Sequence, residues 1–491
     1  MHTPSSQPGR HVLDGTIRVF LAEALLLPTG LLTTVFLTRR LGPEGYGLFL
    51  LAATLVAWME WSITAVFSRA TIKFVSEAED WQSVGTTVMR LHLVAGGGAA
   101  LLLWLLAAPI ATLLNEPVLA AYLRLFALDI PLFSLAHVHR NILIGIEGFK
   151  ERALASAGRW ITRLLLIVLL VALGLSVPGA VLGSIGASLV ELAIGRFYVR
   201  PSLFRRSAFP VRQLWGYAVS LFLFALSMRI YEKLDLLALK VLGATAAQAG
   251  IYGAAQNLSL VPGIFALSFS PLLLSTLNRV LGTGDTRLAK AMSRNAMRAV
   301  IGLLPFAGMT AGSASEIVGL IFGPAFLPAA PFLALLIFAG VARVMISVTT
   351  AILTAVGKPG WTFALIGPLL PLTVTGYLLL IPRWDAIGAA LVTSLFAGLG
   401  ALATVLAVYR IWRILPPTAT LCRSTLLCGL ASALAILWPT PGLLLLLKLP
   451  VIGLVVGLLF LLLGEFSAGE IAMVRSMFPR RTTSKQDPGE V

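Results

Sequence analysis

Residues 164–173 read Leu-Leu-Leu-Ile-Val-Leu-Leu-Val-Ala-Leu, an apolar run without a charged or polar side chain. A continuous run of this kind predicts a membrane helix, because a barrel strand would alternate and a lipid-exposed backbone must satisfy its own hydrogen bonds. Similar runs recur along all 491 residues, of which 58% are hydrophobic and only 12% charged. A soluble domain averages about a quarter charged residues. The sequence therefore predicts an all-α integral membrane protein.

About fourteen apolar runs, each bounded by charge, Gly or Pro, approach the roughly 20 residues that a transmembrane helix needs. They lie near residues 11–37, 46–67, 84–106, 118–145, 153–174, 178–199, 214–240, 250–278, 292–312, 326–352, 360–381, 386–409, 421–438 and 444–464. No small-residue cleavage site follows the first run, so we expect an uncleaved first helix rather than a signal peptide.

Basic residues are distributed unequally between the two sides of the predicted bundle. With the N-terminus in the cytoplasm, 23 Lys and Arg residues fall in cytoplasmic segments and 6 in outer segments. Because Lys and Arg collect on the cytoplasmic side, this distribution predicts that both termini are cytoplasmic. The same rule accounts for the net charge of +16, and nucleic-acid binding is not expected.

Two halves of the chain resemble each other and predict an internal repeat. The matched pairs include Leu41-Gly42 with Leu242-Gly243 at an offset of 201 residues, and Gly148 with Gly357 and Gly179 with Gly388 at an offset of 209. Six helices per half predict two lobes related by a pseudo-two-fold axis along the membrane normal, with an inert duplicated scaffold as the alternative. The predicted divisions are an N-terminal lobe (1–199), a basic linker (200–213), a C-terminal lobe (214–409), an accessory helix pair (410–466) and a cytoplasmic tail (467–491).

Three motifs are similar to those of polysaccharide transporters, the oligosaccharide and O-antigen-type flippases of the multidrug/oligosaccharidyl-lipid/polysaccharide exporter superfamily. The motifs are residues 37–49, Leu-Thr-Arg-Arg-Leu-Gly-Pro-Glu-Gly-Tyr-Gly-Leu-Phe; residues 232–243 followed by Gly-Ile-Tyr-Gly-Ala-Ala at 250–255; and residues 321–326, Ile-Phe-Gly-Pro-Ala-Phe. The likeness covers essentially the whole chain, including the helix number, the repeat and the short loops.

The resemblance implies translocation of an oligosaccharide on a polyprenyl pyrophosphate from the cytoplasmic to the outer leaflet, by alternating access, for surface polysaccharide or lipopolysaccharide synthesis. It implies a multi-pass location in a cell inner membrane. The expected partners are the lipid-linked oligosaccharide and membrane lipids, a polysaccharide polymerase is a candidate partner, and the chain is expected to act as a monomer. No cofactor is expected.

Two other functions remain open on the sequence. A multidrug or toxic-compound antiporter of the same superfamily would share the two six-helix lobes, although cationic drugs would favour an acidic cavity. A membrane enzyme acting on the same glycolipids would need a substantial outer loop, and the predicted outer loops are short. No nucleophile triad, phosphate-binding loop or metal-ligand spacing is present in the sequence, so neither catalytic residues nor a metal site are predicted.

Charged residues within the predicted helices are the candidates for function, because a charge at mid-bilayer costs about 2.5–3.5 kcal/mol and is usually kept for a cavity or a partner. The predicted substrate-binding cations are Arg18, Arg140, Arg159, Arg163, Arg229, Lys233 and Arg343. The predicted ion-coupling candidates are Glu23, Glu60, Asp129 and Asp235.

The strongest pattern is a stripe in the fifth predicted helix. Arg152, Ser156, Arg159 and Arg163 are spaced 4, 3 and 4 residues apart, so they share one helix face. A guanidinium binds phosphate bidentately, which suits a pyrophosphate cargo. The alternative is an arginine reaching the helix end together with one structural salt bridge.

The remaining candidates have equally open interpretations. Arg229, Glu232 and Lys233 are spaced as an internal ion-pair network or as cargo ligands, and the partner of Asp235 is expected on another helix. Glu23 and Glu60 have no partner within four residues, which suits a proton-coupled or ion-coupled switch; a hydrogen bond to a neighbouring helix is the alternative. His137 and His139, two residues apart, are expected to be helix-interface residues rather than proton relays or metal ligands.

Overall fold

The structure, a computed structural model, describes residues 21–203, 209, 234–358, 360–440 and 442–466, and every regular element in these ranges is helical. The helices are α2 (Leu26–Glu77), α3 (Trp81–Leu113), α4 (Leu119–Phe126), α5 (Asp129–Gly145), α6 (Phe149–Leu170), α7 (Ser176–Tyr198), α9 (Ala246–Ser259), α10 (Val261–Gly282), α11 (Thr286–Ile301), α12 (Leu304–Gly312), α13 (Ala314–Phe322), α14 (Ala330–Ala355), α15 (Gly360–Ile366), α16 (Leu369–Trp412), α17 (Thr418–Leu437) and α18 (Leu445–Leu462). The predicted all-α class is confirmed.

Among the described residues, nine helices are long and apolar enough to cross a membrane, or ten if the bent pair of residues 286–312 and 314–322 is one span. Three of the nine are broken internally by a residue with positive φ: Gly42 in α2, Gly174 between α6 and α7, and Asp385 in α16. Each of these helices therefore has two arms, and an arm of roughly 20 residues is long enough to span a bilayer. Most of the predicted helix at 214–240 lies outside the described residues, so the count of fourteen stays a prediction.

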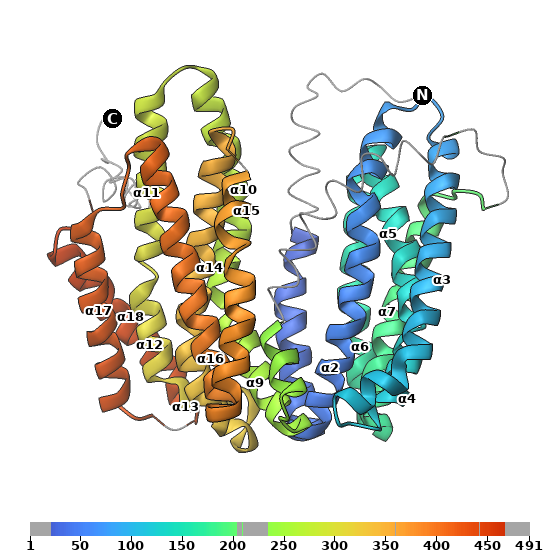
Figure 1. Cartoon of the computed structure of the whole chain (residues 1–491), viewed down its shortest axis with the longest axis horizontal. Helices are drawn as coiled ribbons and strands as arrows, with labels where there is room; N and C mark the ends of the chain where they lie inside the picture. Colours follow the sequence, from blue (N-terminus) through green and yellow to red (C-terminus); the bar gives the residue numbers. More distant parts are fainter. Residues whose placement is uncertain (1–20, 204–208, 210–233, 359, 441, 467–491) are drawn as a thin grey trace, which may run out of the picture.

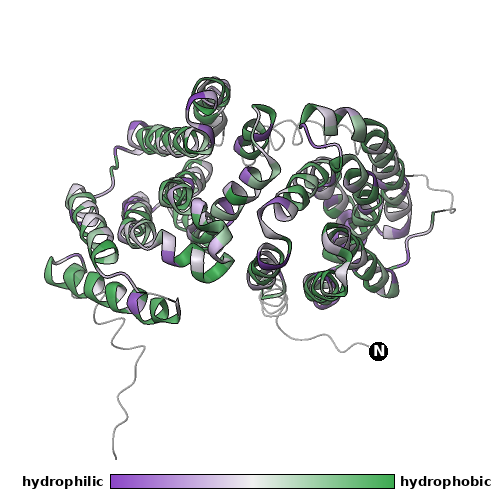
Figure 2. Ribbon diagram, turned by 90° about the horizontal axis from the view of Figure 1, so that it is seen from below, coloured by the Kyte–Doolittle hydropathy of each residue, from purple (hydrophilic) through white to green (hydrophobic). Residues whose placement is uncertain are grey.

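The helices gather into two groups, which we call the N-terminal bundle (α2–α7) and the C-terminal bundle (α9–α16), with α17 and α18 against the outer side of the latter (Figure 1). The ribbons of the two bundles meet at the end where α4, α9 and α13 lie and diverge toward the opposite end. We call the first of these the contact end. Apolar residues cover most of the helices, as a lipid-facing exterior requires (Figure 2).

The two bundles approach most closely where α2 packs against α9. A Cβ atom built on Gly47 would lie 1.9 Å from the carbonyl oxygen of Ala246, and one on Gly250 would lie 2.1 Å from that of Pro43. Both residues must therefore be glycine, because any side chain would push the backbones apart. Asn257 Nδ2 donates a 2.8 Å hydrogen bond to Tyr46 Oη beside this crossing.

Polar contacts join the bundles at the same end. Glu116, in the turn between α3 and α4, accepts hydrogen bonds from Lys240 Nζ at 2.9 Å and from the Ala246 amide at 3.0 Å. Arg39 donates to the carbonyl oxygens of Leu320 and Ile321 in the last turn of α13. A carboxylate thus lies at a helix N-terminus and a guanidinium at a helix C-terminus, where the helix dipole favours each charge.

The accessory pair is docked on α12 by small residues. Gly308 and Gly312 approach the backbone of α17 so closely that a Cβ would lie 2.3 Å from the Cys428 carbonyl oxygen and 2.6 Å from that of Ser432. Small residues four apart allow this packing between membrane helices. Lys448 of α18, fully buried, bonds to Glu316 at the start of α13.

Candidate functional site

Two adjacent cavities lie along α2 and α6 of the N-terminal bundle, and the second extends to α9. The first has a volume of about 430 Å³ and is bounded by the second arm of α2 (43–77), α5 and α6. Its lining residues are Ala53, Thr54, Ala57, Trp58, Glu60, Trp61, Thr64, Phe133, His137 and Arg163. The second, of about 210 Å³, lies between both arms of α2, α6 and α9, and shares Ala53 and Arg163 with the first.

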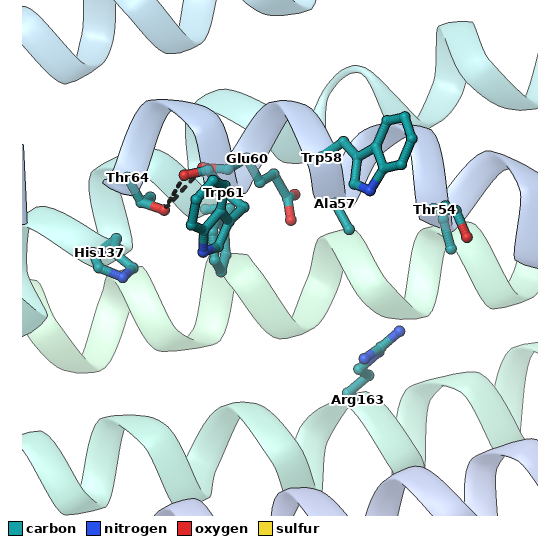
Figure 3. A pocket seen from close by; sticks show the side chains of 10 residues that line it. Thr54, Ala57, Trp58, Glu60, Trp61, Thr64, His137 and Arg163 are labelled. Atoms are coloured by element: carbon teal, nitrogen blue, oxygen red, sulfur yellow. Dashed lines mark hydrogen bonds between the residues drawn. The ribbon is translucent and has the colours of Figure 1, made fainter. Parts of the chain in front are cut away.

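Arg163 stands at the junction of these cavities. It is the fifteenth residue of α6, which places it about 21 Å from the start of the helix at 1.5 Å per residue. Its Nε is buried without a hydrogen-bond partner, and its side chain forms no ion pair with any described residue. Figure 3 shows Arg163 and Glu60 extending from opposite sides into the space between their helices.

The other members of the predicted stripe are neutralised by acids. Arg159 donates to Glu191 Oε2 at 3.0 Å, and Arg140 of α5 donates to Glu191 Oε1 at 2.5 Å. Arg152 lies 3.5 Å from Glu23. Both interpretations of the stripe therefore apply to different members. Arg152 and Arg159 form salt bridges, and Arg163 forms no ion pair with a described residue.

The four predicted ion-coupling carboxylates lie in different environments. Glu23 has its partners on a neighbouring helix, the alternative given for it, since it accepts from Ser156 Oγ at 3.0 Å and pairs with Arg152, both in α6. Glu60 and Asp129 are buried, and each has one carboxylate oxygen without a hydrogen-bond partner among the described residues. Both act electrostatically on Arg159 and Arg163.

Asp235 lies outside this cluster, in the helical segment of residues 234–241. It accepts hydrogen bonds from Tyr252 Oη at 2.8 Å and Gln256 Nε2 at 2.8 and 2.9 Å, and from Thr393 Oγ1 at 3.3 Å. The prediction that its partners are on other helices is confirmed. These bonds tie the helical residues 234–241 to α9 and α16.

The remaining predicted cations do not join the cavity in the described part of the chain. Arg343 lies in α14, is partly buried, and lines neither cavity. Arg18, Arg229 and Lys233 lie outside the described residues, as does Glu232. Of the predicted substrate-binding set, the structure brings together Arg140, Arg159 and Arg163.

Several lining residues were not among the sequence candidates. Trp58 and Trp61 flank Glu60 in the run Trp-Met-Glu-Trp. This run of aromatic residues around a carboxylate is the sequence signal that could have identified them. His137, expected at a helix interface, lines the first cavity and accepts from Asn141 Nδ2 at 3.1 Å. Glu191, which accepts from two arginines, was not among the predicted site residues.

Residues 12–274 match the polysaccharide biosynthesis protein family, which is more than half of the chain. The chain belongs to this family. This match confirms the resemblance to polysaccharide transporters that the sequence motifs predicted. As predicted for a multi-pass protein, it is a helical membrane protein with many spans.

Several proteins that are similar to this chain are named as flippases or transporters. The probable flippase AglR of Haloferax volcanii is 26% identical over 409 residues, covering 80% of this chain and 82% of AglR. The lipid II flippase MurJ in an inward closed conformation has a TM-score of 0.73 at 14% identity, covering 95% of this chain and 100% of its own. An inward-facing multidrug resistance MATE family transporter has a TM-score of 0.64 at 14% identity, covering 81% and 99%.

At these identities the structural likeness concerns the fold alone. The prediction that the family member is not an enzyme agrees with relatives that are named as flippases and transporters. Within the described residues, no group of three or more His, Cys, Asp or Glu side chains is placed to hold a metal ion.

Proposed function

We propose that this protein is a flippase that moves a polyprenyl-pyrophosphate-linked oligosaccharide from the cytoplasmic to the outer leaflet during surface polysaccharide synthesis. The proposal rests on the family membership and on relatives named as flippases. Its cargo is a lipid-linked sugar with a strongly anionic head. The protein would act as a single chain in the cell inner membrane, with a polysaccharide polymerase as a candidate partner.

The observation that carries this proposal is Arg163, which stands between two cavities and forms no ion pair with any described residue. Its neighbours Arg159 and Arg140 are each engaged in a salt bridge with Glu191. A guanidinium that is not already bonded to a carboxylate can bind phosphate through two parallel hydrogen bonds. Arg163 is therefore the proposed pyrophosphate ligand, and Glu60 and Asp129 are the proposed coupling residues beside it.

Fourteen spans and two lobes, 1–199 and 214–409, with both termini cytoplasmic, complete the proposed architecture. The contact end would be the outer mouth, closed in this conformation by the crossing of Gly47 and Gly250. Rocking of the lobes would open that end and close the other. Epitope tags on each terminus, detected from one side of sealed vesicles, test the orientation, and an externally accessible tail would contradict it.

A cation-coupled multidrug antiporter is the second candidate, supported by the fold shared with MATE transporters. Arg163, which has no ion pair among the described residues, favours the anionic cargo, because a cationic drug would be repelled by it. Glu60 and Asp129, each with one carboxylate oxygen that no described residue bonds, supply the acidic groups that a cationic drug would need.

Reconstituted vesicles distinguish the two candidates. We expect the wild-type protein to move a fluorescent, short-chain polyprenyl-pyrophosphate oligosaccharide between leaflets and not to move a cationic dye. Arg163→Ala should slow translocation about tenfold or more, since a hydrogen bond to a charged group contributes about 1.5–3 kcal/mol. Arg163→Lys should rescue it only partly, because the forked geometry is lost.

The matched control is Arg124→Ala. Arg124 is exposed, stacks on Trp104 at 5.2 Å and lies outside both cavities, so this variant should translocate normally. Full translocation by a well-folded Arg163→Ala protein would remove the main support for the flippase proposal. Transport of the dye alone would establish the antiporter instead.

A further inference from the structure

We propose that the cavity of about 430 Å³ is a carbohydrate subsite for a neutral sugar, formed by the rings of Trp58 and Trp61 and the carboxylate of Glu60 beside the phosphate ligand Arg163. This inference rests on the proposed function and adds to it the chemical class of the sugar that adjoins the pyrophosphate.

The cavity has an aromatic wall. Trp58 and Trp61 come from the same stretch of α2 (Figure 3). Phe133 of α5 lines the cavity with them. The guanidinium of Arg159 stacks 4.3 Å from the Phe133 ring and 5.4 Å from the Trp160 ring, and its ion pair with Glu191 holds it there. Phe133 is therefore fixed in place before a ligand arrives.

A pyranose ring matches such a wall. Its faces carry weakly polarised C–H groups, and its edges carry hydroxyls. The electron-rich face of an indole attracts the C–H groups, and stacking removes apolar surface of both partners from water. Flat aromatic rings beside hydrogen-bonding side chains are thus suited to a sugar rather than to an acyl chain.

Glu60 supplies the hydrogen-bonding edge. Its side chain is 8% exposed, it lines the cavity, and its Oε1 is buried without a partner among the described residues. Burying an acceptor without a hydrogen bond is costly, and a carboxylate can accept from two neighbouring hydroxyls at once. A bound sugar would provide the missing donors, with His137 on the same wall as a further polar contact.

The charges around the cavity select a neutral sugar. Glu60 lines it, and the carboxylate of Asp129, whose Oδ1 is buried without a partner in the described part of the chain, acts electrostatically on Glu60. Arg163 also lines the cavity, and its charge is assigned to the pyrophosphate. With that cation engaged, the carboxylate of a uronic acid would meet those of Glu60 and Asp129 in a poorly hydrated space, where like charges repel strongly. A hexose or an N-acetylated hexose avoids this repulsion.

The second cavity is less suited to a sugar. Its volume is about 210 Å³ against about 430 Å³ for the first, and none of its described lining residues carries a carboxylate that could accept from sugar hydroxyls. The sugar is therefore assigned to the first cavity, with the pyrophosphate at the junction.

Three probes test the subsite by direct binding to the purified full-length protein in lipid nanodiscs. They are a short-chain polyprenyl pyrophosphate, its glucose derivative and its glucuronic acid derivative. For the wild-type protein we expect the glucose derivative to bind about tenfold tighter than the sugarless probe, and the glucuronic acid derivative no tighter. Trp58→Ala and Trp61→Ala should abolish the gain from glucose and leave affinity for the sugarless probe unchanged.

Two further variants complete the design. Glu60→Gln should raise affinity for the glucuronic acid derivative, because it removes a repelling charge. Trp384→Ala is the matched control, since Trp384 is 54% exposed and lines neither cavity. Unchanged binding of the sugarless probe by the two tryptophan variants and by Trp384→Ala shows that these three proteins are folded.

The outcomes separate the subsite from the proposed function. If the glucose gain persists in both tryptophan variants, or glucuronic acid binds the wild type as tightly as glucose, the subsite assignment is overturned while the flippase proposal stands. If the wild type binds none of the probes, both are overturned. If Arg163→Ala binds the sugarless probe normally, Arg163 is not the phosphate ligand. The sugar subsite that was placed beside it is then overturned as well.

Discussion

Glu191 explains why the N-terminal bundle tolerates several arginines within the membrane. It is 1% exposed and accepts from Arg140 and Arg159, so one carboxylate is shared by two guanidinium groups. Such buried pairs are costly to desolvate, and they persist when geometry and hydrogen bonding compensate. Arg163 has no such acid bonded to it among the described residues, and this difference separates a structural arginine from a candidate ligand.

Removing Glu191 should therefore destabilise the protein strongly. We expect Glu191→Ala to lower the free energy of unfolding by about 3–5 kcal/mol, because two buried cations lose their partner. Thermal unfolding in detergent measures this. Glu23→Ala is the control: Glu23 is 33% exposed, and a half-exposed pair contributes about 1 kcal/mol or less. Equal melting temperatures for the two variants would contradict the shared-acceptor role of Glu191.

Helix α2 shows how glycine positions shape an element of this fold. Gly42 has φ +68° and breaks the helix into two arms, and Gly243, its partner in the predicted repeat, has φ +109°. Glycine adopts positive φ without steric cost. Gly179 and Gly388, another predicted pair, both face the backbone of the preceding arm: a Cβ built on Gly179 would lie 3.0 Å from the Leu170 carbonyl carbon, and one on Gly388 would lie 2.4 Å from the Leu380 carbonyl oxygen. Gly42 and Gly243 thus both have positive φ, and Gly179 and Gly388 both lie against the backbone of a neighbouring helical arm.

The crossing of α2 and α9 should be sensitive to side-chain size. We expect Gly47→Leu to prevent close approach of the helices, to separate the bundles at the contact end and to reduce translocation at least tenfold. Spin labels on the two bundles, measured by pulsed electron resonance, would report the longer distance. Gly97→Leu is the control, since a Cβ there meets nothing within 4 Å. A normal distance distribution in Gly47→Leu would show that the crossing does not hold this end closed.

In the whole molecule, the contact end combines glycine crossings with charge pairs between the bundles. Glu116 reaches Lys240 and the N-terminus of α9, and Arg39 reaches the C-terminus of α13. At this end the bundles also share one apolar cluster, which includes Tyr46 and Tyr252, whereas further apolar clusters lie within each bundle alone. An interface concentrated at one end suits bundles that move as rigid bodies about it.

A reversible cross-link at this end tests the rocking motion. The chain has two cysteines, Cys422 and Cys428, both free, and replacing both with alanine gives a background for Glu116→Cys with Lys240→Cys. We expect a short, cleavable bis-maleimide linker between the new thiols to stop translocation, because the contact end can no longer open. Cleaving the linker should restore it.

The single-cysteine proteins, treated in the same way, are the controls and should stay active. Continued translocation with the linker in place would locate the gate elsewhere and would remove the rocking model for this protein.

The sequence alone identified the helical membrane class, most of the spans and the family, because long apolar runs and short glycine motifs depend on local chemistry. It also located the arginine stripe, since a spacing of 4, 3 and 4 residues defines one face of a helix whatever surrounds it. It could not tell Arg159 from Arg163, because their difference lies in Glu191, a residue of α7 brought to Arg159 only by packing.

The same reason explains the other differences. Glu23 looked isolated because its partners are more than 120 residues away in the chain, and Trp58 became a cavity residue only once α5 and α6 were placed opposite α2. Ion pairs and cavities between helices depend on how the helices pack, and local periodicity carries no information about which faces meet. Local spacing determines which side chains share a helix face, and the tertiary fold determines which of them are neutralised and which remain free to bind.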